Sequence, residues 1–268
     1  MVVSVVRGRR RIPRPVSLSN LDSFRDHFST IATRYAAYRP HYPHALADAL
    51  AALSPHRDLA WDAGCGNGQL SVLLAERFTR VIATEPSQAQ LDAATAHPRI
   101  DYRCAKAEDA VLDESSADLA VAAQAAHWFD WPRYVAEVAR VTKPGALVAL
   151  VSYGILHMDG EADALVARYY HDDVGAFWPP GREHVENGYR DLAWPWPSIE
   201  PPAIDMTAQW TREELLGYVA TWSATVKRIE AKGPGAYEQL GVELARVWPD
   251  GERRTVSWPL AIRLARRQ

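Results

Sequence analysis

The chain has 268 residues, of which 48% are hydrophobic and 24% charged, and its formal net charge is −3. This length and composition are typical of one globular α/β domain with an elaboration rather than two independent domains. A slightly acidic chain has no overall basic field for nucleic acid, and no window reaches the ~18 apolar residues of a membrane span, which argues against nucleic-acid and membrane partners.

The cysteines predict a reducing compartment. Two of them, Cys65 and Cys104, cannot build a disulfide framework, and a bridge at Cys65 would distort the glycine loop in which it lies. The N-terminus has no apolar signal core. We therefore expect a cytoplasmic protein.

The N-terminal segment 1–23 is basic and contains no acidic residue before Asp22. We predict that it is a disordered extension. A nucleic-acid-binding arm and an organelle-targeting peptide are the alternatives that the sequence leaves open. Residues 24–268 are predicted to form a single domain.

Strand and helix patterns alternate through the first half of the chain. A short helix is predicted over 28–38 and an amphipathic helix over 44–53, and a helix with an early proline over 132–141. Strands are predicted near 58–63, 80–84, 100–103, 117–122 and 146–152. The alternation predicts a parallel sheet with right-handed crossovers, in which ligands bind beyond the carboxyl ends of the strands.

The most informative motif follows the first predicted strand. Asp62 precedes glycines at alternate positions, Gly64, Gly66 and Gly68, and Glu85 stands about 20 residues further on, where the next strand ends. Bare backbone at a helix N-terminus can approach the charged end of a ligand, and an acidic side chain at Glu85 can accept both hydroxyls of a ribose. The motif predicts a nucleoside-containing cofactor in a doubly wound α/β fold.

The loop does not follow the dinucleotide rule. That rule requires glycine at the sixth position of the loop, where this chain has Gln69. A carboxylate at Asp62 would repel a pyrophosphate but suits a sulfonium or an amino group. An NAD-dependent oxidoreductase and a plain glycine turn are therefore the weaker alternatives.

The segment from Asp62 to Gly68 resembles motif I of the class I S-adenosylmethionine-dependent methyltransferases. Segments 84–87, 105–109, 118–124 and 141–146 are similar to further motifs of this family in the expected order. The resemblance implies S-adenosylmethionine as cofactor. It also implies a Rossmann-like seven-stranded sheet of order 3-2-1-4-5-7-6, with strand seven antiparallel and helices on both faces.

Other segments resemble a subgroup that acts on small molecules, which includes trans-aconitate methyltransferase and its fungal relatives. They lie at 35–43, 123–130, 189–190, 217–223 and 257–260. This similarity implies a small-molecule methyl acceptor.

The second half of the chain predicts a covering segment and the last strands. Residues 153–203 contain a predicted helix and then an aromatic, proline-rich stretch typical of a binding lid, so we predict a lid insertion after strand five. A capping box opens a helix at about 211, and another helix covers about 234–247. Strands six and seven are predicted at 204–209 and 255–265.

The resemblance implies a cofactor site built from the ends of the strands. Asp62 would hold the amino group of the cofactor, and Glu85 would bind its ribose. Ala107 and Glu108 would meet the adenine, although many relatives carry an acidic residue where this chain has Lys106. The predicted cofactor-binding residues are Tyr38, Arg39, Asp62, Gly64, Cys65, Gly66, Gly68, Glu85, Pro86, Gln90, Ala107, Glu108 and Gln124.

His127 is the candidate catalytic residue, because the unperturbed pKa of histidine lies near neutral pH. The alternative is a packed histidine at the start of a helix. Trp128 could contact the sulfonium through a cation–π interaction or pack in the core. The predicted substrate residues are His127, Trp128, Trp178, Arg182 and Tyr189. No metal is predicted, since the histidines are scattered.

The expected reaction is an in-line displacement on the sulfonium methyl. A carboxylate acceptor needs no base, and no base other than His127 is visible, which favours a carboxylic acid as substrate. The alternative in another class is a catalytically inactive S-adenosylmethionine-binding protein that acts through partners.

Overall fold

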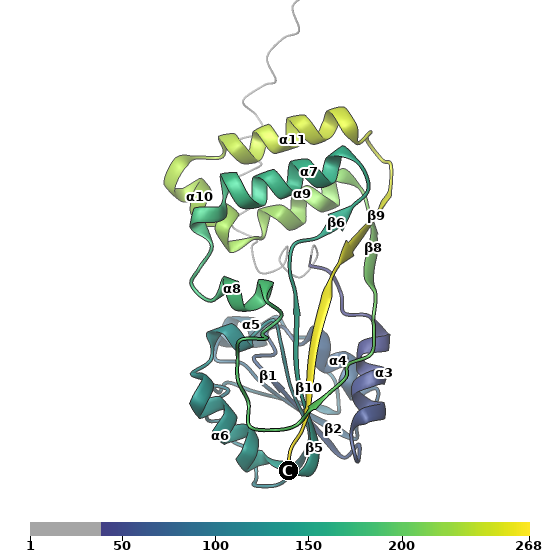
Figure 1. Cartoon of the computed structure of the whole chain (residues 1–268), viewed down its shortest axis with the longest axis vertical. Helices are drawn as coiled ribbons and strands as arrows, with labels where there is room; N and C mark the ends of the chain where they lie inside the picture. The colour runs from purple at the N-terminus through teal and green to yellow at the C-terminus, as the bar shows by residue number, and fades with distance from the viewer. Residues whose placement is uncertain (1–38) are drawn as a thin grey trace, which may run out of the picture. The chain divides into compact units, whose positions relative to one another are not determined.

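A computed structural model describes residues 39–268 (Figure 1). They fall within one compact unit, Ala32–Gln268. The predictions for segment 1–23, for the helix over 28–38 and for Tyr38 lie outside the described residues.

Seven strands form the main sheet in the order β3-β2-β1-β4-β5-β10-β7. Their bounds are Leu59–Ala63 for β1, Arg80–Thr84 for β2, Ile100–Arg103 for β3, Ala117–Ala123 for β4, Thr142–Tyr153 for β5, Ser198–Ile199 for β7 and Leu260–Arg266 for β10. Strands β1 to β5 pair in parallel, whereas β10 is antiparallel to both of its neighbours. The predicted Rossmann-like sheet with one inserted antiparallel strand is confirmed.

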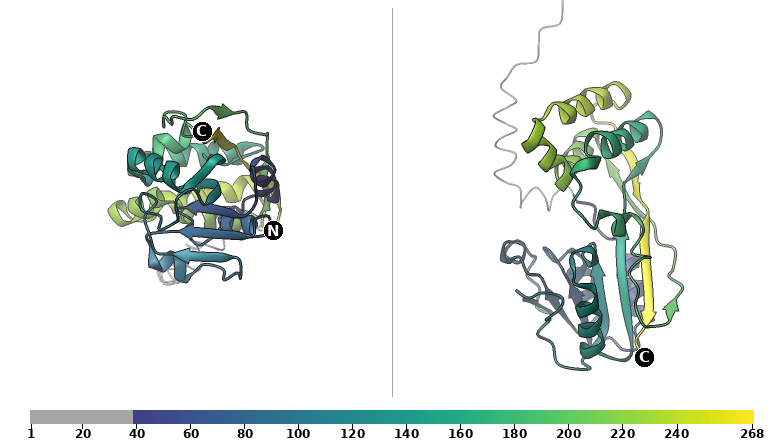
Figure 2. Two further views of the ribbon diagram at one scale, coloured as in Figure 1. Left: turned by 90° about the horizontal axis from the view of Figure 1, so that it is seen from below. Right: turned by 60° about the vertical axis from the view of Figure 1, so that its left-hand side comes forward.

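Helices cover both faces of this sheet. On one face lie α3 (His44–Leu53) and α4 (Gln69–Ala75), and on the other lie α6 (Trp131–Val141) and α8 (Arg182–Glu186). Strands buried on both sides need apolar residues at nearly every position, as the near-continuous apolar runs of the sequence indicate. Figure 2 shows the long antiparallel pair of β5 and β10 beside the parallel strands.

The prediction that residues 204–209 form strand six of the main sheet was wrong. The edge strand is β7, while β8 (Met206–Trp210) pairs with β9 (Arg254–Trp258) in a second sheet that also contains β6 (His157–Met158). The predicted strand over 255–265 is divided at Pro259, because proline has no N–H for a ladder. Its halves, β9 and β10, therefore belong to different sheets.

A second hydrophobic core lies among the helices drawn with the small sheet in Figure 1. These elements are α7 (Glu161–Arg168), η2 (Tyr169–Asp173), η3 (Gly175–Phe177), α9 (Arg212–Ala220), α10 (Ser223–Lys232) and α11 (Gly235–Val247). We call them, with the small sheet, the helical layer. Its core contains Tyr153, Tyr170, Tyr218, Trp248 and Trp258, so the packing extends well beyond the predicted insertion at 153–203.

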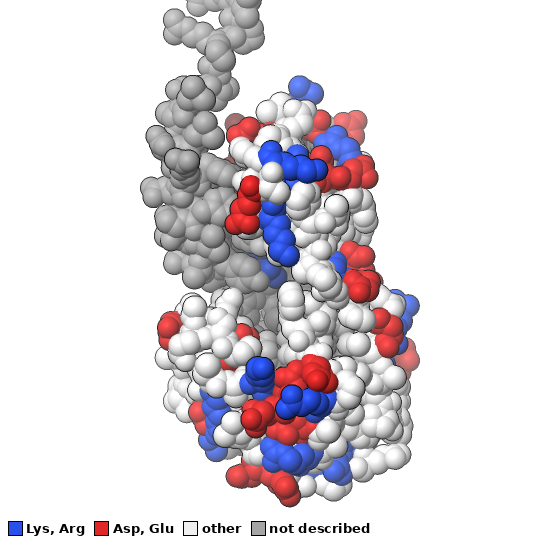
Figure 3. Space-filling view, turned by 90° about the vertical axis from the view of Figure 1, so that its left-hand side faces the viewer, with Lys and Arg blue, Asp and Glu red and all other residues white. Residues whose placement is uncertain are grey.

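The face shown in Figure 3 carries acidic and basic side chains side by side. Among the residues drawn in colour there, no large area is uniformly basic. No helix in the described part of the chain has the length and apolar character needed to span a membrane.

Candidate active site

The glycine loop joins the carboxyl end of β1 to α4. The backbone N–H groups of Gly64 and Cys65 both donate to the Thr84 carbonyl, at 2.8 and 3.0 Å, which ties the loop to the end of β2. A Cβ at Gly64, where φ is +69°, would come 2.6 Å from the Cβ of Ala125. Only glycine fits this position, because the backbone is left-handed and the neighbouring chain is too close.

Glu85 connects the end of β2 to the same loop. One of its carboxylate oxygens accepts from the Gly66 N–H at 3.1 Å, and the other accepts from the Ser87 N–H at 3.0 Å. The carboxylate is therefore held between the two segments that the sequence singled out. Each oxygen keeps a lone pair for a further donor.

Asp62, near the end of β1, is almost fully buried and forms no ion pair with a described residue. The Ser71 hydroxyl donates to its Oδ2 at 2.6 Å. Burial raises the pKa of Asp62 to about 6; the Ser71 hydrogen bond opposes this shift and the Glu85 charge adds to it. A buried carboxylate with a hydrogen bond but no cation is suited to a cationic ligand.

A cavity of about 130 Å³ opens beside the glycine loop, and Tyr153 at the end of β5 forms part of its wall. We call it the loop cavity. The predicted cofactor residues that line it are Arg39, Asp62, Gly64, Cys65, Gly66, Gln90 and Gln124. Residues from 39 to 153 thus meet at one place, as expected for the carboxyl edge of a parallel sheet.

Other predicted cofactor residues lie outside this lining. Gly68 faces Tyr102, whose hydroxyl oxygen would stand 2.2 Å from an added Cβ. Ala107 is buried in the core on the α6 side, and one oxygen of Glu108 accepts from the Asp130 N–H, just before α6. The Pro86 carbonyl faces the thiol of the exposed Cys104.

A second cavity, of about 160 Å³, shares Arg39, Gln124 and Tyr153 with the loop cavity. We call it the inner cavity. The predicted substrate residues that line it are His127, Trp128, Trp178 and Arg182. Tyr189 does not line it: its side chain is fully buried, and its hydroxyl lies 3.0 Å from Nδ1 of His127. The structure places Tyr189 behind His127 and outside the lining, and its contact with substrate stays a prediction.

The inner cavity is cationic and aromatic. The Arg182 guanidinium lies 4.5 Å from the centre of the Trp178 ring, and its Nε donates to the Tyr170 hydroxyl at 2.7 Å. Glu186 lies 3.5 Å from the same guanidinium, but no acidic side chain of the described residues lines the cavity itself. Burial, aided by the charges of Arg182 and His184, lowers the pKa of His127 to about 4, so its imidazole is neutral at neutral pH.

Gln124 is the strained residue between the two cavities. Its φ is +53°, and its side-chain amide donates to the Tyr153 carbonyl at 2.8 Å. A non-glycine residue with left-handed backbone has an energetic cost and concentrates at functional sites. Sequence reasoning found Gln124 from its place after strand four.

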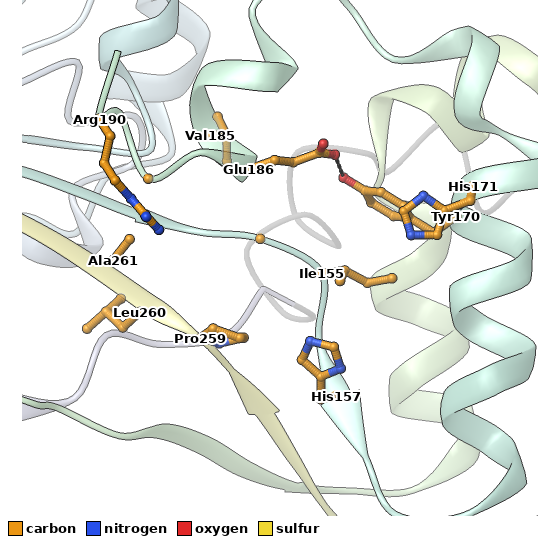
Figure 4. A pocket seen from close by; sticks show the side chains of 12 residues that line it. Ile155, His157, Tyr170, His171, Val185, Glu186, Arg190, Pro259, Leu260 and Ala261 are labelled. Atoms are coloured by element: carbon orange, nitrogen blue, oxygen red, sulfur yellow. Dashed lines mark hydrogen bonds between the residues drawn. The ribbon is translucent and has the colours of Figure 1, made fainter. Parts of the chain in front are cut away.

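A third cavity, of about 520 Å³, is drawn in Figure 4 and contains no predicted site residue. It shares Gly154, Ile155 and Tyr170 with the inner cavity. The hydrogen bond between Tyr170 and Glu186 appears as the dashed line in Figure 4, and Arg190 lies among the labelled lining residues.

Sequence reasoning assigned no role to Tyr153, Tyr170 or Trp222, which line the inner cavity. Tyr153 could have been found, because it ends strand five at the ligand edge of the sheet. Tyr170 and Trp222 come from η2 and the turn before α10, and their approach to the sheet depends on tertiary packing.

The comparisons with known proteins agree with this geometry. A family model described as a methyltransferase domain matches residues 61–150. The chain is 29% identical over 253 residues to a Dictyostelium discoideum protein assigned as a methyltransferase, covering 91% of this chain and 96% of that protein. It is 32% identical over 122 residues to a Serratia marcescens malonyl-[acyl-carrier protein] O-methyltransferase, covering 44% of this chain and 47% of that protein.

Among solved structures, one from Anaeromyxobacter dehalogenans, assigned as a type II methyltransferase, is 44% identical with a TM-score of 0.81, covering 85% of this chain and 97% of that chain. A Rossmann-like sheet with a cavity between a glycine loop and an acidic strand end defines a class of cofactor-dependent α/β enzymes. Within it, the chain belongs to the class I S-adenosylmethionine-dependent methyltransferases.

The residues of the loop cavity fit this cofactor. Apart from Gly66 itself and its two chain neighbours, no described residue has an atom within 4 Å of the point where a Cβ of Gly66 would stand, so the backbone there is open to a ligand. Asp62 offers a buried carboxylate without a cationic partner among the described residues. When bound, S-adenosylmethionine supplies a methyl group activated by its sulfonium.

Proposed function

We propose that this methyltransferase acts on a small molecule that carries a carboxylate. The observation that carries the proposal is the inner cavity, where Arg182 is fixed beside Trp178. Glu186 lies 3.5 Å from the guanidinium, but no acidic side chain of the described residues lines the cavity. A guanidinium in a partly buried aromatic wall suits recognition of a carboxylate. The volume of about 160 Å³ suits a small acceptor.

The chemistry agrees with an acid. A carboxylate oxygen can attack the methyl group without losing a proton, so the reaction needs no general base. The chain then has to orient the acceptor and exclude water. Tyr170, Trp178 and Trp222 pack as one aromatic cluster at the wall of the inner cavity, which keeps water out.

The cofactor side of the proposal keeps the predicted roles. Asp62 pairs with the amino group of the cofactor, Glu85 accepts the ribose hydroxyls, and Arg39 neutralises the cofactor carboxylate. The role of Arg39 is supported by its position, since Arg39, like Gln124, lines both the loop cavity and the inner cavity. The Serratia relative, whose name is that of an O-methyltransferase, agrees with oxygen as the accepting atom.

The test is a panel of small carboxylic acids, each with its amide as a neutral partner, incubated with labelled cofactor and read by mass analysis. We expect label on acids and none on amides. Arg182→Met should raise the acceptor KM by about 10-fold to 100-fold, the value of a charge-assisted hydrogen bond. Arg190→Met is the matched control: of the three cavities described above, Arg190 lines the third and not the inner cavity, so this variant should leave KM unchanged.

Two outcomes would contradict this proposal. Methylation of amines or phenols in preference to acids would refute the proposal that the acceptor is a carboxylate. Tight cofactor binding without turnover across the whole panel would favour the inactive binding protein instead.

A further inference from the structure

We propose that His127 donates a hydrogen bond from Nε2 to the acceptor, and that Tyr189 is a positioning residue that fixes His127 in this tautomer. The inference rests on the proposed carboxylate acceptor for its functional part. Its structural part, the tautomer, stands on the geometry around Tyr189 alone.

The Tyr189 hydroxyl has one direction in which to donate. The side chain is fully buried, and Nδ1 of His127 is the hydrogen-bond partner that the described residues offer to its oxygen. If Nδ1 carried the ring proton and donated it, the phenol proton would be buried without an acceptor. The phenol proton is therefore assigned to the hydrogen bond with Nδ1 of His127, 3.0 Å away, and the two rings stack with an interplanar angle of 19°. Burial raises the pKa of Tyr189, so the phenol keeps this proton at neutral pH.

A neutral imidazole carries one N–H. If Nδ1 accepts from Tyr189, the proton lies on Nε2, on the ring edge away from the buried phenol. His127 lines the inner cavity together with Arg182. His127 therefore presents a donor there, and an acid acceptor would meet a guanidinium and an imidazole N–H.

Tyr189 is held in place at an energetic cost. Its φ is +60°, its N–H donates to the His184 carbonyl at 2.7 Å, and its carbonyl accepts from the Arg263 guanidinium of β10. At the preceding Gly188, an added Cβ would come 2.8 Å from the Cβ of Ala261. A buried, strained tyrosine fixed by the inserted strand indicates a function beyond packing.

The charged groups around His127 do not favour a proton on it. Arg182 and His184 of α8 lower its pKa, Glu183 of α8 opposes them weakly, and burial is the largest cause. No acidic side chain of the described residues forms an ion pair with His127. Without a carboxylate to stabilise imidazolium, His127 is poorly arranged to take up a proton from the acceptor.

The first experiment reads the tautomer without any acceptor. The full-length protein, with ¹⁵N-labelled histidine and no cofactor, is studied by long-range ¹H–¹⁵N correlation at pH 7, with His127→Gln used to assign the signal. We expect the Nε2–H form in the native protein and a mixture of tautomers in Tyr189→Phe. An Nδ1–H form or an imidazolium at His127 would overturn the inference, whatever the substrate is.

The second experiment separates donation from proton transfer. The amide nitrogen of glutamine can replace Nε2 and that of asparagine Nδ1, so His127→Gln should keep the acceptor KM within about 3-fold and His127→Asn should raise it about 10-fold, with kcat little changed. At saturating cofactor the native kcat/KM for acceptor should be flat between pH 6 and 9. A limb in this range that His127→Gln removes would identify a base and overturn the inference.

The two failures are distinguishable. If no acid is methylated, the proposed function fails, while the tautomer can still be observed. If acids are methylated but Nδ1 carries the proton, this inference fails, both for Tyr189 and for donation from Nε2 of His127, and the proposed function stands. Melting curves of Tyr189→Phe, a nearly volume-conserving change, show whether that variant is folded.

Discussion

Asp62 is the residue at which stability and function oppose each other. Its pKa in the folded protein is raised from 3.8 to about 6, so the folded state binds the proton more tightly than the unfolded state. The corresponding stability is fully present below pH 3.8 and is lost as the pH rises through about 6. At pH 8 the buried charge therefore destabilises the protein without cofactor.

We predict that Asp62→Asn is more stable than the native protein at pH 8 in the absence of cofactor. The shift corresponds to at most about 3 kcal/mol, and the amide N–H groups left without partners reduce the expected gain to about 1 kcal/mol. Thermal melting of both proteins at pH 8 and pH 5 tests this, because the difference should shrink at pH 5. The variant should also bind S-adenosylhomocysteine weakly, and a less stable variant at pH 8 would refute the assignment.

Glu85→Ala should weaken cofactor binding by about 100-fold, since two charge-assisted hydrogen bonds are worth about 3 kcal/mol. The variant also frees the N–H groups of Gly66 and Ser87, so the loop should lose order as well. Isothermal titration with S-adenosylhomocysteine measures the loss. Glu76→Ala, at the end of α4, is the control. Equal cofactor affinity in both variants would refute the assignment of Glu85 to the ribose site.

Among single residues, the sequence predicts best those whose position follows from the topology of the sheet. Asp62, Gly64 and Gln124 follow strand ends, and parallel strands bring such positions together. Tyr189 is a predicted substrate residue whose full burial cannot be read from the local sequence. Its burial behind His127 depends on a left-handed turn and on Arg263, about 70 residues away.

Among the elements, α9 begins with a complete capping box. The Thr211 hydroxyl accepts from the Glu214 N–H, and the Glu214 carboxylate accepts from the Thr211 N–H at 2.7 Å. The sequence predicted this helix start correctly. Helix α10 was missed, because Trp222 at its N-cap position gives no side-chain capping signal.

Thr211→Ala should lower the free energy of unfolding by about 1 kcal/mol, the usual cost of losing an N-cap. Thr211→Ser keeps the hydroxyl and should be close to the native protein. Urea unfolding compares the three. An alanine variant as stable as the serine variant would show that the cap contributes nothing.

Short elements set the limit of sequence reasoning. Helix α3 has the predicted bounds because its apolar residues repeat over three turns. Strand β7 has two residues and follows Pro197, so it has no period to detect. The position of β7 beside β10 is determined by the path of the chain that leads to it and not by a pattern in its own two residues.

The described molecule contains separate cores in the main sheet and the helical layer. Trp258 belongs to the latter, where its ring lies 4.8 Å from Trp210 and 5.9 Å from Tyr218. Trp61 is the buried tryptophan of the main sheet, and its Nε1 donates to Thr84 at 3.0 Å. The two side chains allow each core to be weakened separately.

Trp258→Ala should cost about 3–5 kcal/mol and act mainly on the helical layer. Amide hydrogen exchange should accelerate in α9, α11 and β8 more than in β1 and β4. Trp61→Phe, a milder change in the main sheet, should give the opposite distribution. Uniform acceleration by Trp258→Ala would show that both cores open together.

The chain passes between the main sheet and the helical layer repeatedly: from β5 to β6, from η3 to α8, from β7 to β8 and from β9 to β10. Hinge closure of a domain uses one or a few short hinge segments, whereas a rotation of the helical layer against the main sheet would bend all of these crossings at once. We therefore expect the helical layer to stay fixed relative to the main sheet. Substrate and product must then pass through an opening at the edge of the inner cavity. We expect this opening beside Trp128, which lines the cavity and is 64% exposed.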